Sequence, residues 1–105
     1  MSEYLYRLQP TRPEMLSQGP SPEEGRLIGE HFAYLQDLVA RGVVSFAGRT
    51  MDPDADAFGL VVFEACDEET ALGIMQADPA VAAGVMQARL FPFKSILKAS
   101  PSVQA

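Results

Sequence analysis

The sequence has few of the residues that mark secreted or nucleic-acid-binding proteins. Its single cysteine, Cys66, cannot form an internal disulfide, which suits a reducing cytoplasm. Because Cys66 follows an apolar segment, we expect it to be structural rather than reactive. Eight basic residues, scattered singly, stand against fourteen acidic ones, and the net charge is -6. Nucleic-acid binding depends on clustered Lys and Arg, so we expect no nucleic-acid partner.

Membrane and export signals are also missing. No apolar run reaches the roughly 18 residues that a membrane-spanning helix needs. The chain opens with Met1, Ser2 and Glu3, which places an acid where a secretory signal carries positive charge. We therefore expect a cytoplasmic protein with no membrane partner.

Ligands for metals and cofactors are scarce. The only histidine, His31, has no second histidine or cysteine at ligand spacing, and scattered carboxylates match zinc or iron poorly. The methionines form no stripe, so neither haem nor copper is indicated. The glycines lack the strand-glycine-helix context of a nucleotide fingerprint. We expect neither a metal nor another cofactor.

What the chain does have is enough apolar sequence for one core. It is 105 residues long and 48% hydrophobic, which suits one domain and is too short for two. We expect a single domain over residues 1–98. Residues 99–105 read as a flexible, polar C-terminal tail.

The first half predicts a strand and a helix. Residues 4–9 are aromatic and branched and end at Pro10, which favours a strand, and a loop follows to about residue 20. Ser21, with proline after it and Glu24 three positions on, predicts a helix start. The helix should end at Gly42. The side chains on its apolar face, which also includes His31, are Leu27, Ile28, Phe32, Leu35, Leu38 and Val39.

The second half predicts a hairpin, a helix and a strand. Strands 43–49 and 58–64 are joined by a polar turn at residues 52–56. A second helix capped by Asp67 should end near Ala77, and a last strand over 85–91 should end at Pro92. The order βαββαβ indicates a ferredoxin-like α+β fold, with two helices on one face of a four-stranded antiparallel sheet. The side chains of the second helix expected to face inward are Ala71, Leu72, Ile74 and Met75.

The strand over residues 58–64 is apolar on both faces. Leu60 and Val62 point to one side, and Val61 and Phe63 point to the other. Two helices cover only one face of the sheet, so the other would leave an apolar patch in water. A second copy of the chain is the simplest cover, and we expect a homodimer.

Two side chains are candidates for acid/base chemistry. His31 lies within the apolar stripe of its helix, and Asp78 stands before a rigid proline. Each also has a structural interpretation: a histidine satisfied in the core, and the cap of a short helical turn. For Asp78 the two roles can coexist.

Three further residues are candidates for substrate binding. The guanidinium groups of Arg7 and Arg49 could hold a carboxylate, although isolated strand arginines are usually solvated. Tyr6 could line the same cavity or belong to the core.

Four segments carry a family resemblance. They are residues 30–35 (EHFAYL), 46–50 (FAGRT), 58–65 (FGLVVFEA) and 78–85 (DPAVAAGV), in this order. The sequence resembles the YCII-like (YciI-related) family from Tyr4 to about Leu97. The resemblance implies a protein of the dimeric α/β barrel type, similar in architecture to muconolactone isomerases. It also implies a His-Asp pair as the active site, at the positions of His31 and Asp78.

The function that the resemblance implies is cofactor-free enzymology of the lyase, isomerase or dehalogenase type. On that pattern His31 is a general base, and Asp78 fixes its tautomer and stabilises the imidazolium. The substrate would be a small, unsaturated and anionic metabolite. The main alternative is a non-catalytic small-molecule-binding or accessory protein whose His-Asp pair serves the structure. An enzyme related to monooxygenases of the same fold is a weaker third interpretation.

Overall fold

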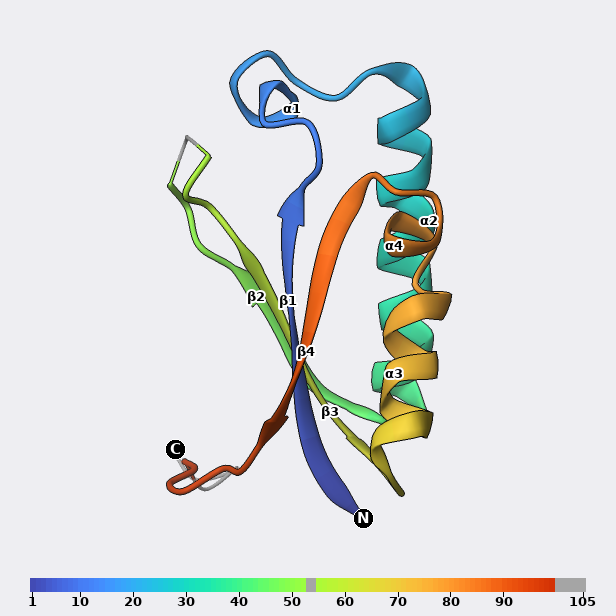
Figure 1. The fold of residues 1–105 in the computed structure, drawn as a ribbon, viewed down its shortest axis with the longest axis vertical. Coiled ribbons are helices and arrows are strands. Elements are labelled where there is room, and N and C mark those ends of the chain that lie inside the picture. Colours follow the sequence, from blue (N-terminus) through green and yellow to red (C-terminus); the bar gives the residue numbers. More distant parts are fainter. Residues whose placement is uncertain (53–54, 100–105) are drawn as a thin grey trace, which may run out of the picture.

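The computed structural model describes residues 1–52 and 55–99. The chain alternates strands and helices in the expected order, with two short helices added (Figure 1). The elements are β1 (Ser2–Pro10), α1 (Glu14–Ser17), α2 (Pro22–Ala40), β2 (Val44–Arg49), β3 (Gly59–Ala65), α3 (Glu68–Ala77), α4 (Pro79–Ala82) and β4 (Met86–Phe93).

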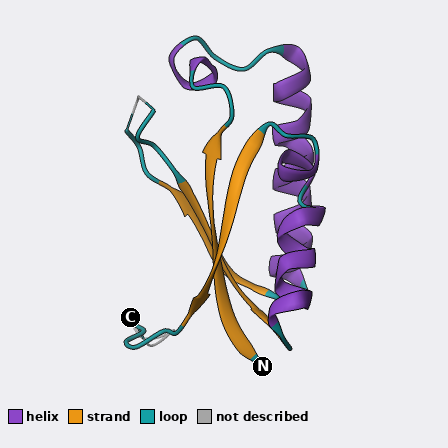
Figure 2. Cartoon of the chain, in the orientation of Figure 1, coloured by secondary structure: helices purple, strands orange, loops and turns teal. Residues whose placement is uncertain are grey.

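The strands form one antiparallel sheet in the order β2-β3-β1-β4. Helices α2, α3 and α4 lie on one side of this sheet, and its other side faces away from them (Figure 2). This confirms the predicted ferredoxin-like α+β fold. β1 occupies the middle of the sheet, where Tyr6 pairs with Val61 of β3 on one side and with Leu90 of β4 on the other.

The core lies between the sheet and the helices. Alternate residues of β1 are buried, namely Tyr4, Tyr6 and Leu8, because successive side chains of a strand point to opposite faces. They pack with Phe63 of β3 and with Leu35 of α2, among others. The alternation of β1 therefore places Tyr6 at the centre of the core, with no exposed surface.

The start of α2 follows the sequence signal. The Ser21 hydroxyl accepts the Glu24 N–H at 3.2 Å, and the Glu24 carboxylate accepts the Ser21 N–H at 2.8 Å. This reciprocal capping satisfies two of the amides that a helix start leaves without partners. At the other end Gly42 has a φ of 77°, a conformation that glycine adopts without steric cost.

One residue expected to face inward is not buried, since Leu72 of α3 is 38% exposed. Phe32 and Val39, on the predicted apolar face of α2, are 58% and 50% exposed. Cys66 is exposed, with its Sγ 3.3 Å from the Thr70 hydroxyl, and its structural rather than reactive character stays a prediction.

The predicted loop between β1 and α2 contains the helical turn α1, which buries Met15. The Arg12 guanidinium holds this segment against the start of α2. It donates to both carboxylate oxygens of Glu24, at 2.9 and 2.7 Å, and to the Gly19 carbonyl at 3.3 Å. A helical turn that depends on such contacts has no strong local signal in the sequence.

The last strand continues past its predicted end. β4 runs through Pro92 to Phe93, with Pro92 opposite Tyr4. β4 is an edge strand, where one side of the backbone needs no ladder bond, so the missing N–H of proline is tolerated.

Two predictions fall partly outside the described residues: the polar turn at 52–56, which contains residues 53 and 54, and the tail at 99–105, which contains residues 100–105. Over the ranges 1–52 and 55–99, the helices are all too short or too polar to cross a membrane.

Candidate functional site

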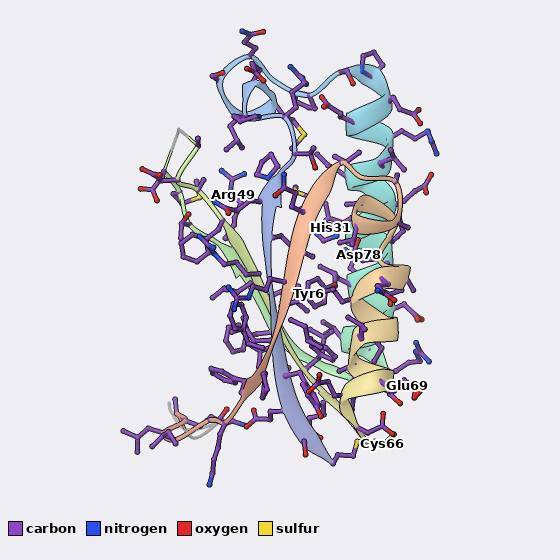
Figure 3. All side chains as sticks on the ribbon, in the orientation of Figure 1. Tyr6, His31, Arg49, Cys66, Glu69 and Asp78 are labelled. Atoms are coloured by element: carbon purple, nitrogen blue, oxygen red, sulfur yellow. The ribbon has the colours of Figure 1, made fainter. Side chains whose placement is uncertain are left out.

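His31 and Asp78 lie in direct contact, although 47 residues separate them in the sequence. His31 comes from the buried side of α2, and Asp78 comes from the joint between α3 and α4 (Figure 3). The Nδ1 atom of His31 is 2.8 Å from both carboxylate oxygens of Asp78. The pair that the sequence and the family resemblance suggested is therefore assembled in the fold.

The local sequence explains the position of Asp78. This residue ends α3 and begins α4, where its carboxylate accepts the Ala80 N–H at 3.0 Å. Pro79 suits the first position of the new helix because its fixed φ is helical and its missing N–H would have no partner there. The bend aims the Asp78 side chain at α2, and it is fully buried. Capping and contact with His31 therefore coexist.

The Asp78 carboxylate has a third donor, the hydroxyl of Tyr6. Tyr6 projects from the middle of β1 and donates to Oδ2 at 2.7 Å. Burial, followed by the nearby charge of Asp78 and this hydrogen bond, raises the pKa of Tyr6 far above its usual range, so the phenol stays protonated. The carboxylate oxygens therefore face donors from three different elements.

The contact with Asp78 also decides the tautomer of His31. An ionised carboxylate only accepts, so the hydrogen of a neutral imidazole is on Nδ1. Nε2 then carries the lone pair. The His31 side chain is only 9% exposed, and His31 is one of the residues that line a cavity. The free lone pair is therefore on Nε2, the ring nitrogen that makes no contact with Asp78.

The cavity has a volume of about 610 Å³ and lies between α2, the segment around α1, and the sheet. Volumes of this size suit a small organic molecule. Most of its wall is apolar, and polar side chains are few. The apolar lining includes Leu8, Met15, Ile28, Phe32, Leu35 and Val39, and the polar lining includes His31, Gln36, Arg49 and Thr50.

The exposed aromatic ring of Phe32 belongs to this wall, as does the Val39 side chain. Both side chains therefore contribute surface to the cavity. Sequence periodicity showed that both residues share a face with His31, but it could not distinguish a wall from a core. Gln36 and Thr50 were missed because an isolated polar residue on a helix or after a strand is typical of any surface.

The two candidate arginines lie on opposite sides of the sheet. Arg49, at the end of β2, lines the cavity. Arg7 alternates with the buried Tyr6 and Leu8, so it points to the other face, where its guanidinium lies 4.8 Å from the centre of the Phe58 ring. Arg7 does not line the cavity, and its role in substrate binding stays a prediction. Tyr6 reaches the site through Asp78 rather than through the cavity wall.

The residues that the structure describes contain no group of three His, Cys, Asp or Glu side chains that could hold a metal ion.

Comparison with solved structures found a similar fold in 5-chloro-2-hydroxyhydroquinone dehydrochlorinase from Burkholderia phenoliruptrix AC1100, in complex with 2,5-dihydroxybenzoquinone. The TM-score is 0.61, with 20% sequence identity over 87% of this chain and 93% of that one. At this identity the likeness supports the fold. No curated protein matches the sequence. Residues 5–94 match the YCII-related domain, and the chain therefore belongs to the YCII-related family.

Proposed function

We propose that this protein is a small-molecule enzyme of the dehalogenase, lyase or isomerase kind, in which His31 is the general base. The observation that carries the proposal is the contact between His31 Nδ1 and the buried Asp78 carboxylate. It leaves the basic nitrogen for a ligand in a cavity of about 610 Å³. The structural neighbour's name describes a dehydrochlorinase, which supports a reaction of this class.

The chemistry requires one proton transfer. Nε2 of His31 takes an acidic O–H or C–H proton from the ligand, and the imidazolium formed is stabilised by the negative charge of Asp78. In an elimination, the released electron pair forms a new double bond and the carbon–halogen bond breaks to give halide. In an isomerisation, the double bond shifts and the imidazolium returns the proton to another carbon.

The cavity favours an unsaturated, mainly apolar substrate with one anionic group. Its wall is largely apolar, and Arg49 offers a guanidinium that can bind a carboxylate or phenolate. We propose Arg49 as the residue that binds the anionic group of the substrate, and we assign no such role to Arg7, which does not line the cavity.

We also propose that two copies of the chain associate through the sheet face opposite the helices. Phe46 is 58% exposed, and the guanidinium of Arg89 lies 4.7 Å from the centre of the Phe91 ring. Aromatic surface and arginine are typical of protein interfaces. Sedimentation at micromolar concentration should show a dimer, and a monomer alone would contradict this.

A cytoplasmic location stays a prediction.

A non-catalytic binding protein is the second candidate. Three donors on a buried carboxylate are also what a purely structural network would provide. In this interpretation the cavity binds a ligand without turnover.

The test is an assay of halide release and of product absorbance on halogenated hydroxyhydroquinones, together with unsaturated lactones as isomerisation substrates. We expect turnover in the wild type, and a loss of at least about 100-fold in His31→Gln and in Asp78→Asn. Asp67→Asn is a matched control, since Asp67 caps α3 in the same way but is exposed. Undiminished turnover in His31→Gln would refute the general base, and binding without turnover would favour the second candidate.

A further inference from the structure

The position of the Tyr6 hydroxyl is fixed by the pairing of β1 with β3 and β4. Tyr6 lies in the central strand, has no exposed surface, and packs its ring against Phe63 at 5.7 Å between centres. Its hydroxyl donates to Oδ2 of Asp78 at 2.7 Å. Tyr6 is not among the residues that line the cavity. It therefore cannot touch a ligand there, yet it touches the carboxylate on which His31 depends.

Two neutral donors bind the carboxylate from its two ends. The Tyr6 hydroxyl binds Oδ2, and the Ala80 N–H binds Oδ1 at 3.0 Å. Both oxygens remain 2.8 Å from Nδ1 of His31. Of these two donors, the amide is fixed by the cap of α4, whereas the hydroxyl is supplied by a side chain 72 residues away.

We propose that Tyr6 is a positioning residue for the general base: its hydroxyl fixes the orientation of the Asp78 carboxylate and draws off part of the charge that the carboxylate presents to His31. This inference rests on the proposed function, since it assigns a role to Tyr6 in the acid/base pair. The role of Tyr6 is therefore to orient Asp78, not to bind substrate.

The other titratable groups around the pair do not duplicate this contact. Tyr34, on α2, donates its hydroxyl to the Ile74 carbonyl at 2.7 Å, and Arg49 belongs to the cavity wall on β2. Burial, followed by the charge of Asp78, raises the pKa of Tyr34 as well, so both phenols remain protonated. Among the described residues, Tyr6 alone donates a hydroxyl to Asp78.

Loss of the Tyr6 hydroxyl should shift the titration of His31 to higher pH. In Tyr6→Phe the carboxylate loses a donor and its charge acts undivided on His31, so the pair holds its proton more tightly. We expect its apparent pKa to rise by about 0.5 or more. Asp78→Asn removes the negative charge and should lower the same pKa. The two substitutions therefore move the titration in opposite directions.

The experiment is an NMR pH titration of the ring protons of the only histidine, in the wild type, Tyr6→Phe, Tyr4→Phe and Asp78→Asn. Tyr4 is the matched control, because it lies buried on the same face of β1 with its ring 6.0 Å from that of Phe63. A Tyr6→Phe curve that coincides with the wild-type curve, or lies at lower pH, would overturn the role of Tyr6. If Asp78→Asn leaves the curve unchanged, the proposed function itself fails.

A second measurement needs no substitution and covers the case in which Tyr6→Phe does not fold. In the wild type the buried Tyr6 hydroxyl proton should exchange slowly and resonate downfield, and its chemical shift should change with the same midpoint as the His31 ring. A slowly exchanging hydroxyl proton that is insensitive to the His31 titration, or no such proton at all, would overturn the proposal.

Discussion

Replacing Asp78 by alanine should destabilise the fold far more than removing an ordinary helix cap. Asp78 is fully buried, and its carboxylate accepts from the Tyr6 hydroxyl, His31 Nδ1 and the Ala80 N–H. Alanine is small enough to fit but offers no acceptor. All three donors would then be buried beside a methyl group.

The magnitude follows from these contacts. A buried donor left without a partner costs about 1–2 kcal/mol for each of Tyr6 and His31, and the lost cap of α4 costs about 1 kcal/mol more. The sum is roughly 3–5 kcal/mol. Removing a buried charge returns part of this. We therefore expect a net loss of at least about 2 kcal/mol, which is a large part of the stability of a domain of this size.

The assay is urea unfolding of the wild type, Asp78→Ala and Asp67→Ala. Asp67 accepts the Thr70 N–H at 2.8 Å at the start of α3 but is exposed, so its loss should cost only about 1 kcal/mol. The difference between the two variants isolates the buried network from the capping. Equal losses in the two variants would refute the idea that Tyr6 and His31 depend on this carboxylate.

Three further outcomes test the core, the segment over the cavity and the ligand site. Phe63→Ala, at a position with no exposed surface, should lower the free energy of unfolding by about 3–5 kcal/mol in urea, and a loss below about 1.5 would contradict its central packing. The hydrogen bonds from Arg12, followed by the one from the Ser21 N–H, lower the pKa of Glu24 from 4.5 to about 2. The stability that the ionised Glu24 carboxylate contributes is therefore fully present above pH 4.5 and is lost as the pH falls toward 2. The stability difference between the wild type and Glu24→Gln, followed by urea unfolding at each pH, should shrink over that range, and a constant difference would contradict the contact. Arg49→Gln should weaken binding of the halogenated hydroxyhydroquinone of the proposed turnover assay about tenfold or more by calorimetry, with stability changed by less than about 0.5 kcal/mol; unchanged affinity would exclude Arg49 from the site.

The fold could be predicted because its signals are local. The cap at Ser21, the stop at Gly42 and the alternation of β1 each depend on a few neighbouring residues. Two features that the sequence did not predict depend on tertiary structure. Pro92 is tolerated because β4 is an edge strand, and the burial of Met15 in α1 depends on tertiary contacts. Neither fact can be derived from the residues next to them.

The site could be predicted only in part. The sequence marked His31 and Asp78 as unusual, but their contact spans 47 residues, and only the family resemblance joined them. Tyr6 was selected as a side chain that could line the cavity, and its bond to Asp78 depends on how the sheet and the α3–α4 joint come together. Periodicity identifies the face on which a residue lies, not the partner that it meets there.

The central place of β1 has a consequence for how the molecule forms. β1 precedes both of its partners in the sequence, and β4 is the last of the described strands. The apolar side chains of β1 therefore cannot be buried in the sheet until the segments that form β3 and β4 are also present. Closing such long loops is entropically costly and makes folding slow compared with that of proteins built from local contacts. Because Tyr6 lies in this strand and Asp78 lies 72 residues later, the polar cluster cannot form before the sheet closes. An intact cluster is thus a sign of a completely folded chain.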